Sequence, residues 1–310
     1  MLDNAAKAFF HLLASSSVLT KLAARYGTRG PTSFARRFIA GETVAEAIEV
    51  ARAVEARGLL QTLDYLGEGV ATLAAADAAT REYVRIIDAI TASGIDRNLS
   101  LKLTQLGLDV DRASAVDNLR RILERAEGFF VRIDMEGSSY TDMTLDIFET
   151  LWNQGHRQIG VVLQADLYRT ERDVQRINAL GARIRLVKGA YREKKAIAFQ
   201  RKADVDRAYA RLVKRLLVEG TYPAIATHDP AMMELARRFA AERDIAADRF
   251  EFQMLYGIRR DLQTLLAAAG HRVRVYIPFG RQWFPYFMRR LGERPANVGF
   301  VLRGIAGESR

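Results

Sequence analysis

The chain has 310 residues, and its 47 Lys and Arg against 37 Asp and Glu give a formal net charge of +10. With 49% hydrophobic and 27% charged residues it has the composition of a globular protein, which excludes collagen-like and disordered chains. Cysteine is absent, which excludes disulfides, thiolate metal centres and a cysteine nucleophile, and no apolar run reaches the ~18 residues of a membrane span.

The N-terminal part of the chain predicts helices. Residues 8–13 and 18–26 are short apolar stretches that favour packed or surface helices over a cleaved targeting peptide. Thr43 and Glu46 have the spacing of a capping box, and the helix expected over 44–57 ends before Gly58. We therefore expect residues 1–58 to form an N-terminal helical segment and residues 59–310 to form the main domain.

From residue 59 onward, short strand patterns alternate with amphipathic helices. Helices are indicated over 112–127, from Thr170 to Gly181, over 205–217 and from the N-cap Asp229 with Pro230. Eight strands are expected, near 59–66, 99–105, 129–135, 159–164, 183–189, 223–228, 250–255 and 272–278.

Strands that are each followed by a helix predict an α/β fold, a distorted (β/α)8 TIM-like barrel with N-terminal helices and a final helix over its mouth. A doubly wound parallel sheet is the main alternative.

Several strands carry charge on one face only. Arg132 and Asp134 alternate with apolar residues, as do Arg274 and Tyr276, and Lys102 lies between two leucines. Because both faces of a parallel barrel strand are normally apolar, this predicts a cation-rich interior that holds an anionic ligand, with acidic residues as internal partners. A half-exposed antiparallel sheet is the alternative. The cations expected to converge on one mouth are Lys102, Arg132, Arg185, Arg274, Arg289 and Arg290, and the acidic partners are Asp64, Asp134 and Glu251.

Three familiar motifs are incomplete or missing. Residues 67–72 (GEGVAT) lack the third glycine of a dinucleotide-binding loop. The four histidines have no metal-binding spacing, so no protein-bound metal is expected, and there is no GxSxG element. Basic residues form no dense block, so nucleic-acid binding is not expected either.

The last helical pattern, 281–291 (RQWFPYFMRRL), combines aromatic and basic residues. Tyr286 precedes Arg289 by three positions and Arg290 by four, so the ring and both guanidinium groups share one side of a helix. This side is either a solvated basic face or the underside of a lid whose arginines bind a carboxylate while Tyr286 covers an apolar ring.

Nine stretches in order resemble proline dehydrogenases, in particular the short monofunctional bacterial type. They are LDYLGE (63–68), SLKLTQLG (100–107), VRIDMEGS (131–138), VVLQAD (161–166), RLVKGAY (185–191), ATHD (226–229), FEFQMLYG (250–257), YIPFG (276–280) and YFMRRL (286–291). The resemblance implies FAD-dependent oxidation of L-proline to Δ1-pyrroline-5-carboxylate by hydride transfer to flavin N5, the first step of proline catabolism. Arg192 departs from many longer relatives, which carry Trp there.

The resemblance also implies roles for individual residues. Asp134 and Arg185 are the implied catalytic residues, and Glu68 would pair with Arg289 as a gate. The implied substrate-binding residues are Lys102, Tyr191, Leu255, Tyr276, Tyr286, Arg289 and Arg290. The implied FAD-binding residues are Met135, Gln164, Arg185, Val187, Lys188, Gly189, Ala190, Thr227 and His228.

The electron acceptor implied by the resemblance is a membrane quinone. It implies a cytoplasmic protein that can associate peripherally with the inner face of the membrane, for which the positive charge and N-terminal helices would be suited. Two other functions stay open on the sequence alone. One is a basic barrel that binds nucleic acid or a membrane surface without redox chemistry, and the other is a barrel enzyme acting on another small anionic metabolite, such as a phosphorylated one, without flavin.

Overall fold

A computed structural model describes residues 34–293, apart from the side chains of Arg289 and of residues 291–293. The helices expected within residues 1–26 lie outside this range. The eight expected strands are all present. They are β1 (Leu60–Tyr65), β2 (Asn98–Leu101), β3 (Phe130–Ile133), β4 (Ile159–Gln164), β5 (Arg183–Val187), β6 (Ala224–Ala226), β7 (Glu251–Leu255) and β8 (Val273–Phe279).

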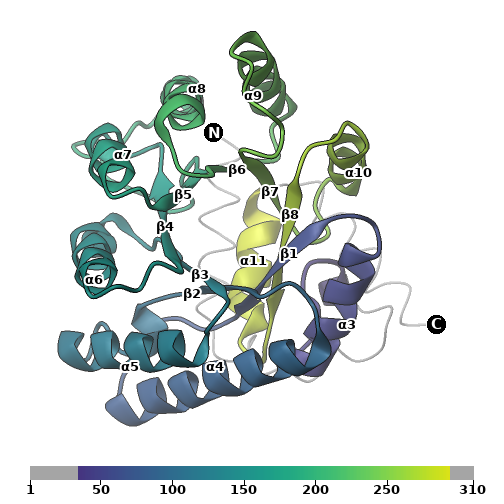
Figure 1. Ribbon diagram of the computed structural model, residues 1–310. Coiled ribbons are helices and arrows are strands. Elements are labelled where there is room, and N and C mark those ends of the chain that lie inside the picture. The colour runs from purple at the N-terminus through teal and green to yellow at the C-terminus, as the bar shows by residue number, and fades with distance from the viewer. Residues whose placement is uncertain (1–33, 294–310) are drawn as a thin grey trace.

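The strands form a closed barrel in sequence order, and every neighbouring pair is parallel (Figure 1). Closure is made by β1 and β8, which pair over six residues from Leu60 opposite Arg274 to Tyr65 opposite Phe279. The (β/α)8 prediction is therefore confirmed. The doubly wound sheet is wrong because the observed sheet is closed. The half-exposed antiparallel sheet is wrong because all neighbouring strands are parallel.

Helices surround the barrel, as Figure 1 shows. Short 3-10 helices are η1 (Phe34–Arg37), η2 (Thr104–Leu106) and η3 (Ser138–Tyr140). The α-helices are α3 (Val44–Glu55), α4 (Leu73–Ser93), α5 (Arg112–Arg125), α6 (Thr141–Asn153), α7 (Thr170–Ala179), α8 (Lys202–Glu219), α9 (Pro230–Glu242), α10 (Arg260–Ala268) and α11 (Trp283–Glu293).

Helix starts follow the capping residues read from the sequence. Thr43 and Glu46 form the expected capping box of α3, and Asp229 caps α9 with Pro230 at its first position. Helix α3 buries Ala47, Ala51 and Val54 in the main core and packs on β1 and β8, so it covers the seam where the barrel closes.

Several strands are shorter than their patterns predicted, and two of these differences shape the site. The second strand ends at Leu101, because the chain then turns through Lys102 into η2. Leu103, just before η2, and Leu106, within it, are both buried. The third ends at Ile133, which leaves Asp134 and Met135 beyond the ladder, at the carboxyl end of the barrel. Both departures place polar side chains at the mouth, where barrel enzymes carry their active sites.

The final helix α11 follows β8 and crosses the barrel opening in Figure 1. Its apolar side packs on the segment before α3, where the rings of Phe287 and Phe38 are 6.0 Å apart. Within α11, the rings of Trp283 and Phe287 are 5.8 Å apart. These residues form a second hydrophobic cluster with Ile39 and Leu66. Aromatic packing therefore holds α11 over the mouth. None of the helices in residues 34–293 is long and apolar enough to cross a membrane.

Candidate active site at the barrel mouth

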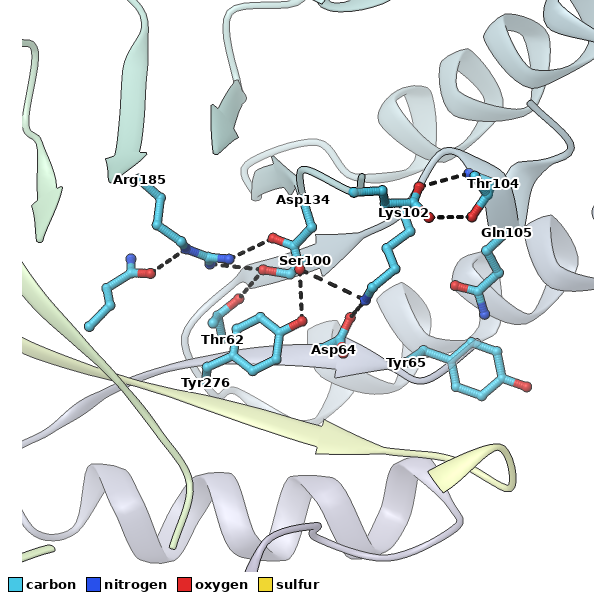
Figure 2. A network of polar contacts seen from close by, with 12 residues as sticks. Thr62, Asp64, Tyr65, Ser100, Lys102, Thr104, Gln105, Asp134, Arg185 and Tyr276 are labelled. Carbon is cyan, nitrogen blue, oxygen red and sulfur yellow. Dashed lines mark hydrogen bonds and ion pairs between the residues drawn. The ribbon is translucent and has the colours of Figure 1, made fainter. Parts of the chain in front are cut away.

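A continuous polar network lies at the carboxyl ends of the first strands, in the region drawn in Figure 2. Lys102 Nζ is 3.4 Å from Asp64 Oδ1 and 3.9 Å from Asp134 Oδ2. The side chain of Lys102 is 12% exposed and that of Asp64 only 1%, so the pair is withdrawn from solvent. Burial by itself lowers the pKa of Lys102, but the carboxylates of Asp64 and Asp134 outweigh it and raise that pKa, so the ammonium stays charged.

Asp134 is the hub of this network. Its Oδ1 accepts from Arg185 Nη1 at 2.6 Å, and its Oδ2 accepts from the Tyr276 hydroxyl at 2.7 Å. Burial, reinforced by the Asp134 carboxylate, raises the pKa of Tyr276 well above its ordinary value, which keeps the phenol neutral and able to donate. Side chains from β5, from β8 and from the position just after β3 thus meet at one carboxylate.

Arg185 is fixed at every nitrogen. Besides its bond to Asp134, its Nε donates to Gln253 Oε1 at 2.5 Å and its Nη2 donates to Ser100 Oγ at 3.0 Å. Its guanidinium carbon also lies 5.2 Å from the centroid of the Tyr276 ring. A buried guanidinium with a hydrogen-bond partner at each nitrogen is preorganised, so it presents a fixed positive charge below the mouth.

Two cations expected at the mouth lie in the barrel floor instead. Arg274 pairs with Glu251 at 2.9 Å and with Asp96 at 2.6 Å, next to the start of β2. Arg132 donates to the carbonyls of Val161 and Arg183. The expected convergence of all six cations is therefore wrong, because the period of a strand gives the face of a side chain but not whether a long side chain points up or down the barrel axis.

The loop that carries Glu68 is tied to the second and third strands. Thr104 donates to Glu136 through its N–H at 3.2 Å and its hydroxyl at 2.6 Å, and its hydroxyl oxygen accepts from Gly69 N at 3.0 Å. Glu136 is buried, and this burial raises its pKa against the opposing hydrogen bonds from Thr104. Glu68 is exposed at the mouth, close enough to raise the pKa of Lys102. The Arg289 side chain lies outside the described residues, so the Glu68–Arg289 gate stays a prediction.

The residues implied to bind the cofactor lie on neighbouring strand ends. Gln164 is buried at the end of β4 and donates to the Glu136 carbonyl at 3.0 Å. Lys188, just beyond β5, is held between Asp206 at 2.5 Å and Asp229 at 2.7 Å. Gly189 has a φ of +122°, and a Cβ there would come within 2.0 Å of the Asp166 carboxylate, so the position requires glycine. Val187 and Ala190 flank this turn, and Met135 is buried at the end of β3.

The next two strand ends are joined by a histidine. His228 Nε2 accepts from the backbone N–H of Leu255 at 2.9 Å, which links the end of β7 to the segment after β6. Thr227 is buried there, and its hydroxyl oxygen accepts from Asp229 N at 3.1 Å. Tyr191 is half-buried and approaches Gly137 across the mouth. His228, which is implied to bind the cofactor, is therefore in direct contact with Leu255, which is implied to bind the substrate.

The shared face predicted for the last helix is present as far as the side chains are described. The Arg290 guanidinium carbon lies 5.1 Å from the centroid of the Tyr286 ring, and Tyr286 is buried. Arg289 belongs to the same helix, but its side chain is not described. The guanidinium therefore stacks on the ring that the sequence placed beside it.

Sequence reasoning assigned no role in the site to several residues that build it. Ser100 and Gln253 were not named for the site, although each fixes Arg185. Asp64 was expected as an internal acidic partner, and it is indeed the carboxylate nearest to Lys102. Asp166 was missed, although an acidic residue two positions after a buried strand is a usable indication of a mouth residue. Among residues 34–293 no group of three or more His, Asp or Glu side chains could hold a metal ion.

Comparison with known proteins gives a consistent result. The family model for proline dehydrogenase matches residues 47–303. The chain is 44% identical to proline dehydrogenase 1 of Bacillus subtilis subsp. natto over 298 residues, covering 96% of this chain and 97% of the relative. It is 43% identical to the proline dehydrogenase of Deinococcus radiodurans over 279 residues, covering 88% and 90%.

Solved structures show the same fold. Proline utilization A from Bdellovibrio bacteriovorus, inactivated by N-propargylglycine, superposes with a TM-score of 0.78 at 24% identity. The match covers 92% of this chain and 38% of that longer one.

Proposed function

The chain belongs to the proline dehydrogenase family, and we propose that it oxidises L-proline to Δ1-pyrroline-5-carboxylate with FAD as cofactor and a quinone as electron acceptor. The observation that carries the proposal is the buried network of Lys102, Asp134, Arg185 and Tyr276 at the mouth of a barrel of this family. A rigid charged network of this kind orients a small zwitterionic substrate rather than a polymer.

The residues present fit a flavin. Residues 188–190 follow the end of β5 directly, next to the fixed cation of Arg185, and Gln164 is buried at the neighbouring end of β4. Gln164, Val187, Lys188, Gly189, Ala190, Thr227, His228 and Met135 would hold it, with Arg185 nearest the ring. When bound, FAD supplies the acceptor for a hydride from proline C5, at N5 of the isoalloxazine ring.

The protein's own contribution is to bind and orient the substrate. Arg289, Arg290 and Lys102 would bind the proline carboxylate through charge-assisted hydrogen bonds. Tyr191, Leu255, Tyr276 and Tyr286 would pack around the pyrrolidine ring. Asp134 would hold Lys102, Arg185 and Tyr276 in one geometry, since it contacts all three. The Glu68–Arg289 pair would close the mouth and exclude water.

The acceptor accounts for the proposed location. A quinone dissolved in a membrane can be reached by a protein that binds the cytoplasmic membrane face, and a net charge of +10 favours an anionic lipid surface. We therefore propose a cytoplasmic protein with peripheral membrane association.

Two measurements test the proposal. The purified protein should be yellow, or become so on addition of FAD, with the two absorption bands of a bound flavin. It should also reduce a dye acceptor in a proline-dependent manner. A preparation that stays colourless with added FAD, or one that reduces no dye with proline, would refute it and favour a barrel enzyme for another anionic metabolite.

A further inference from the structure

The connection between β5 and α8 crosses the mouth and is fastened to the segment after β4. Asp166 N donates to the Lys188 carbonyl at 2.9 Å, and Phe199 N donates to the Asp166 carbonyl at 2.8 Å. Tyr168 N donates to the Ile197 carbonyl at 3.0 Å, and the Tyr168 and Phe199 rings meet edge to face at 4.7 Å. We call residues 188–199 the mouth segment. Lys188, Gly189, Ala190 and Tyr191 belong to it, so its position sets four of the residues proposed to bind cofactor and substrate.

The Asp166 carboxyl group lies in the middle of this fastening. The side chain is buried, with the residue 9% exposed, and its Oδ1 has no hydrogen-bond partner. It packs directly against Gly189, where an added Cβ would lie 2.0 Å from Oδ2. A carboxylate in this position would be desolvated, and its Oδ1 would lack the hydrogen bonds that normally compensate for burial.

The charged groups around Asp166 do not neutralise it. On the mouth segment, Lys188 is engaged by Asp206 and Asp229, and Glu193 brings a second negative charge toward Asp166. Glu193 is itself fixed by Ser138, whose N–H donates to it at 2.8 Å. The neighbouring elements present Arg169, which pairs with Asp142 and Asp173, and Glu136, which is bonded by Thr104. In the described part of the chain no cation forms an ion pair with Asp166.

We propose that Asp166 is a positioning residue for the active site: in its neutral form it holds the mouth segment closed, and its ionisation opposite Glu193 releases that segment. Burial and the Glu193 charge raise the pKa of Asp166 to about 7, against the effect of backbone hydrogen bonds. The switch would therefore operate near neutral pH. The inference rests on the proposed function only where it assigns cofactor contacts to Lys188, Gly189 and Ala190 and a substrate contact to Tyr191.

The sign and size of the effect follow from linkage. In the released segment Asp166 is solvated and titrates near 3.8, whereas in the closed segment its pKa is about 7. Release is then favoured progressively as the pH rises from about 4 to 7 and changes little above that. With these two values, the population of the released segment increases about tenfold between pH 6 and pH 8.

Proteolysis can measure the released population. Trypsin cleaves after Arg192, Lys194 and Lys195, which are exposed on the mouth segment. We compare the wild type with Asp166→Asn, which keeps the shape and cannot ionise, and with Asp117→Asn on α5 as a matched exposed control. Each is tested as the full purified chain with its bound flavin, at pH 6, 7 and 8, with cleavage sites assigned by mass spectrometry.

The proposal predicts slower cleavage of the mouth segment in Asp166→Asn than in the wild type, with a rate ratio that grows about tenfold from pH 6 to pH 8. Taking the ratio at each pH removes the pH dependence of trypsin itself. Asp117→Asn should match the wild type throughout. A ratio that does not change with pH, or faster cleavage of Asp166→Asn at pH 8, would overturn the proposal, because a merely structural role predicts no pH profile.

Two further readouts keep the proposal testable. Glu193→Gln removes the neighbouring charge, so this variant should be cleaved more slowly than the wild type at pH 8, and its cleavage rate should reach a plateau at lower pH. An unchanged profile counts against the proposal. Flavin fluorescence in the same samples follows cofactor release, which should be slower in Asp166→Asn at pH 8. Cleavage needs neither flavin nor turnover, so a colourless protein with the expected cleavage profile would overturn the cofactor assignment and leave the Asp166 switch standing.

Discussion

Replacing Lys102 by methionine is the most informative perturbation of the mouth, because it removes one charge from a buried cluster and keeps most of the volume. Lys102 lies 3.4 Å from Asp64 and 3.9 Å from Asp134, and the three side chains are 12%, 1% and 11% exposed. After the substitution Asp64 has no cation within reach of an ion pair among the described residues. Its Oδ2 already lacks a hydrogen-bond partner.

The cost can be worked from these distances. Two unit charges 3.4 Å apart interact by about 5 kcal/mol at an effective dielectric constant of about 20. Removing one partner of a buried pair typically destabilises by about 3–5 kcal/mol, since the other charge stays desolvated. We therefore expect Lys102→Met to lower the free energy of unfolding by about 3 kcal/mol or more at pH 8.

The effect should depend on pH in a definite direction. Burial raises the pKa of Asp64 while Lys102 opposes that rise, so loss of Lys102 raises the pKa further. A carboxyl group whose pKa is raised by folding costs nothing below its pKa in the unfolded chain, and costs more as the pH rises toward its folded pKa. Lys102→Met should thus be less destabilising at pH 5 than at pH 8.

Urea denaturation at both pH values measures this. Asp64→Asn added to Lys102→Met should recover about 2 kcal/mol at pH 8, because the unpaired charge is gone. Arg85→Met is the exposed control: it breaks the ion pair of Arg85 with Glu82, and the Arg85 side chain is 70% exposed. It should change the free energy of unfolding by less than about 0.5 kcal/mol. A cost below about 1 kcal/mol for Lys102→Met, or a double variant no more stable than the single one, would refute the reasoning.

Three other substitutions separate substrate binding, cofactor binding and barrel stability. Arg290→Ala should raise the KM for proline at least ~10-fold with flavin still bound, since one charge-assisted bond is lost. Steady-state kinetics and the flavin spectrum measure this, and an unchanged KM would exclude the carboxylate contact. Gly189→Ala should lower the flavin content of the purified protein, because its Cβ would collide with Asp166 at a φ of +122°; full flavin occupancy would contradict it. Arg274→Met should cost about 3–5 kcal/mol by stranding Glu251, and adding Glu251→Leu should restore most of this stability in urea denaturation. No recovery would show that the cost does not come from the unpaired Glu251 charge.

The fold was predictable because each strand carries its period and each helix its caps. Strand positions agree within a few residues, and Thr43 and Asp229 cap the helices they were expected to cap. The error at Lys102 has a physical cause. Leu101 and Leu103 alternate with it as a strand would, but both are fully buried on either side of a turn, and periodicity alone cannot tell a turn packed in the core from a strand.

The site was predictable only in part. The strand period placed Asp134 and Arg185 on the inner face, and the helix period placed Arg290 beside Tyr286. Height along the barrel was not predictable, because an arginine can extend several ångströms up or down from its Cα. Arg274 turns to the floor since its partners Glu251 and Asp96 are there. Partners on other strands, which one sequence cannot pair, decide such directions.

The charges in the barrel interior explain why a final helix is needed over the mouth. The interior carries as many carboxylates as cations, so it supplies no surplus positive charge for an incoming carboxylate. Arg185 is bonded by Asp134, Ser100 and Gln253, and Arg274 is paired in the floor. Under the proposed function we therefore expect the arginines of α11 to supply the main cations for a substrate anion, and the net charge of +10 resides mostly outside the barrel interior. The interior cations are Lys102, Arg132, Arg185 and Arg274, and the interior carboxylates are Asp64, Asp134, Glu136 and Glu251.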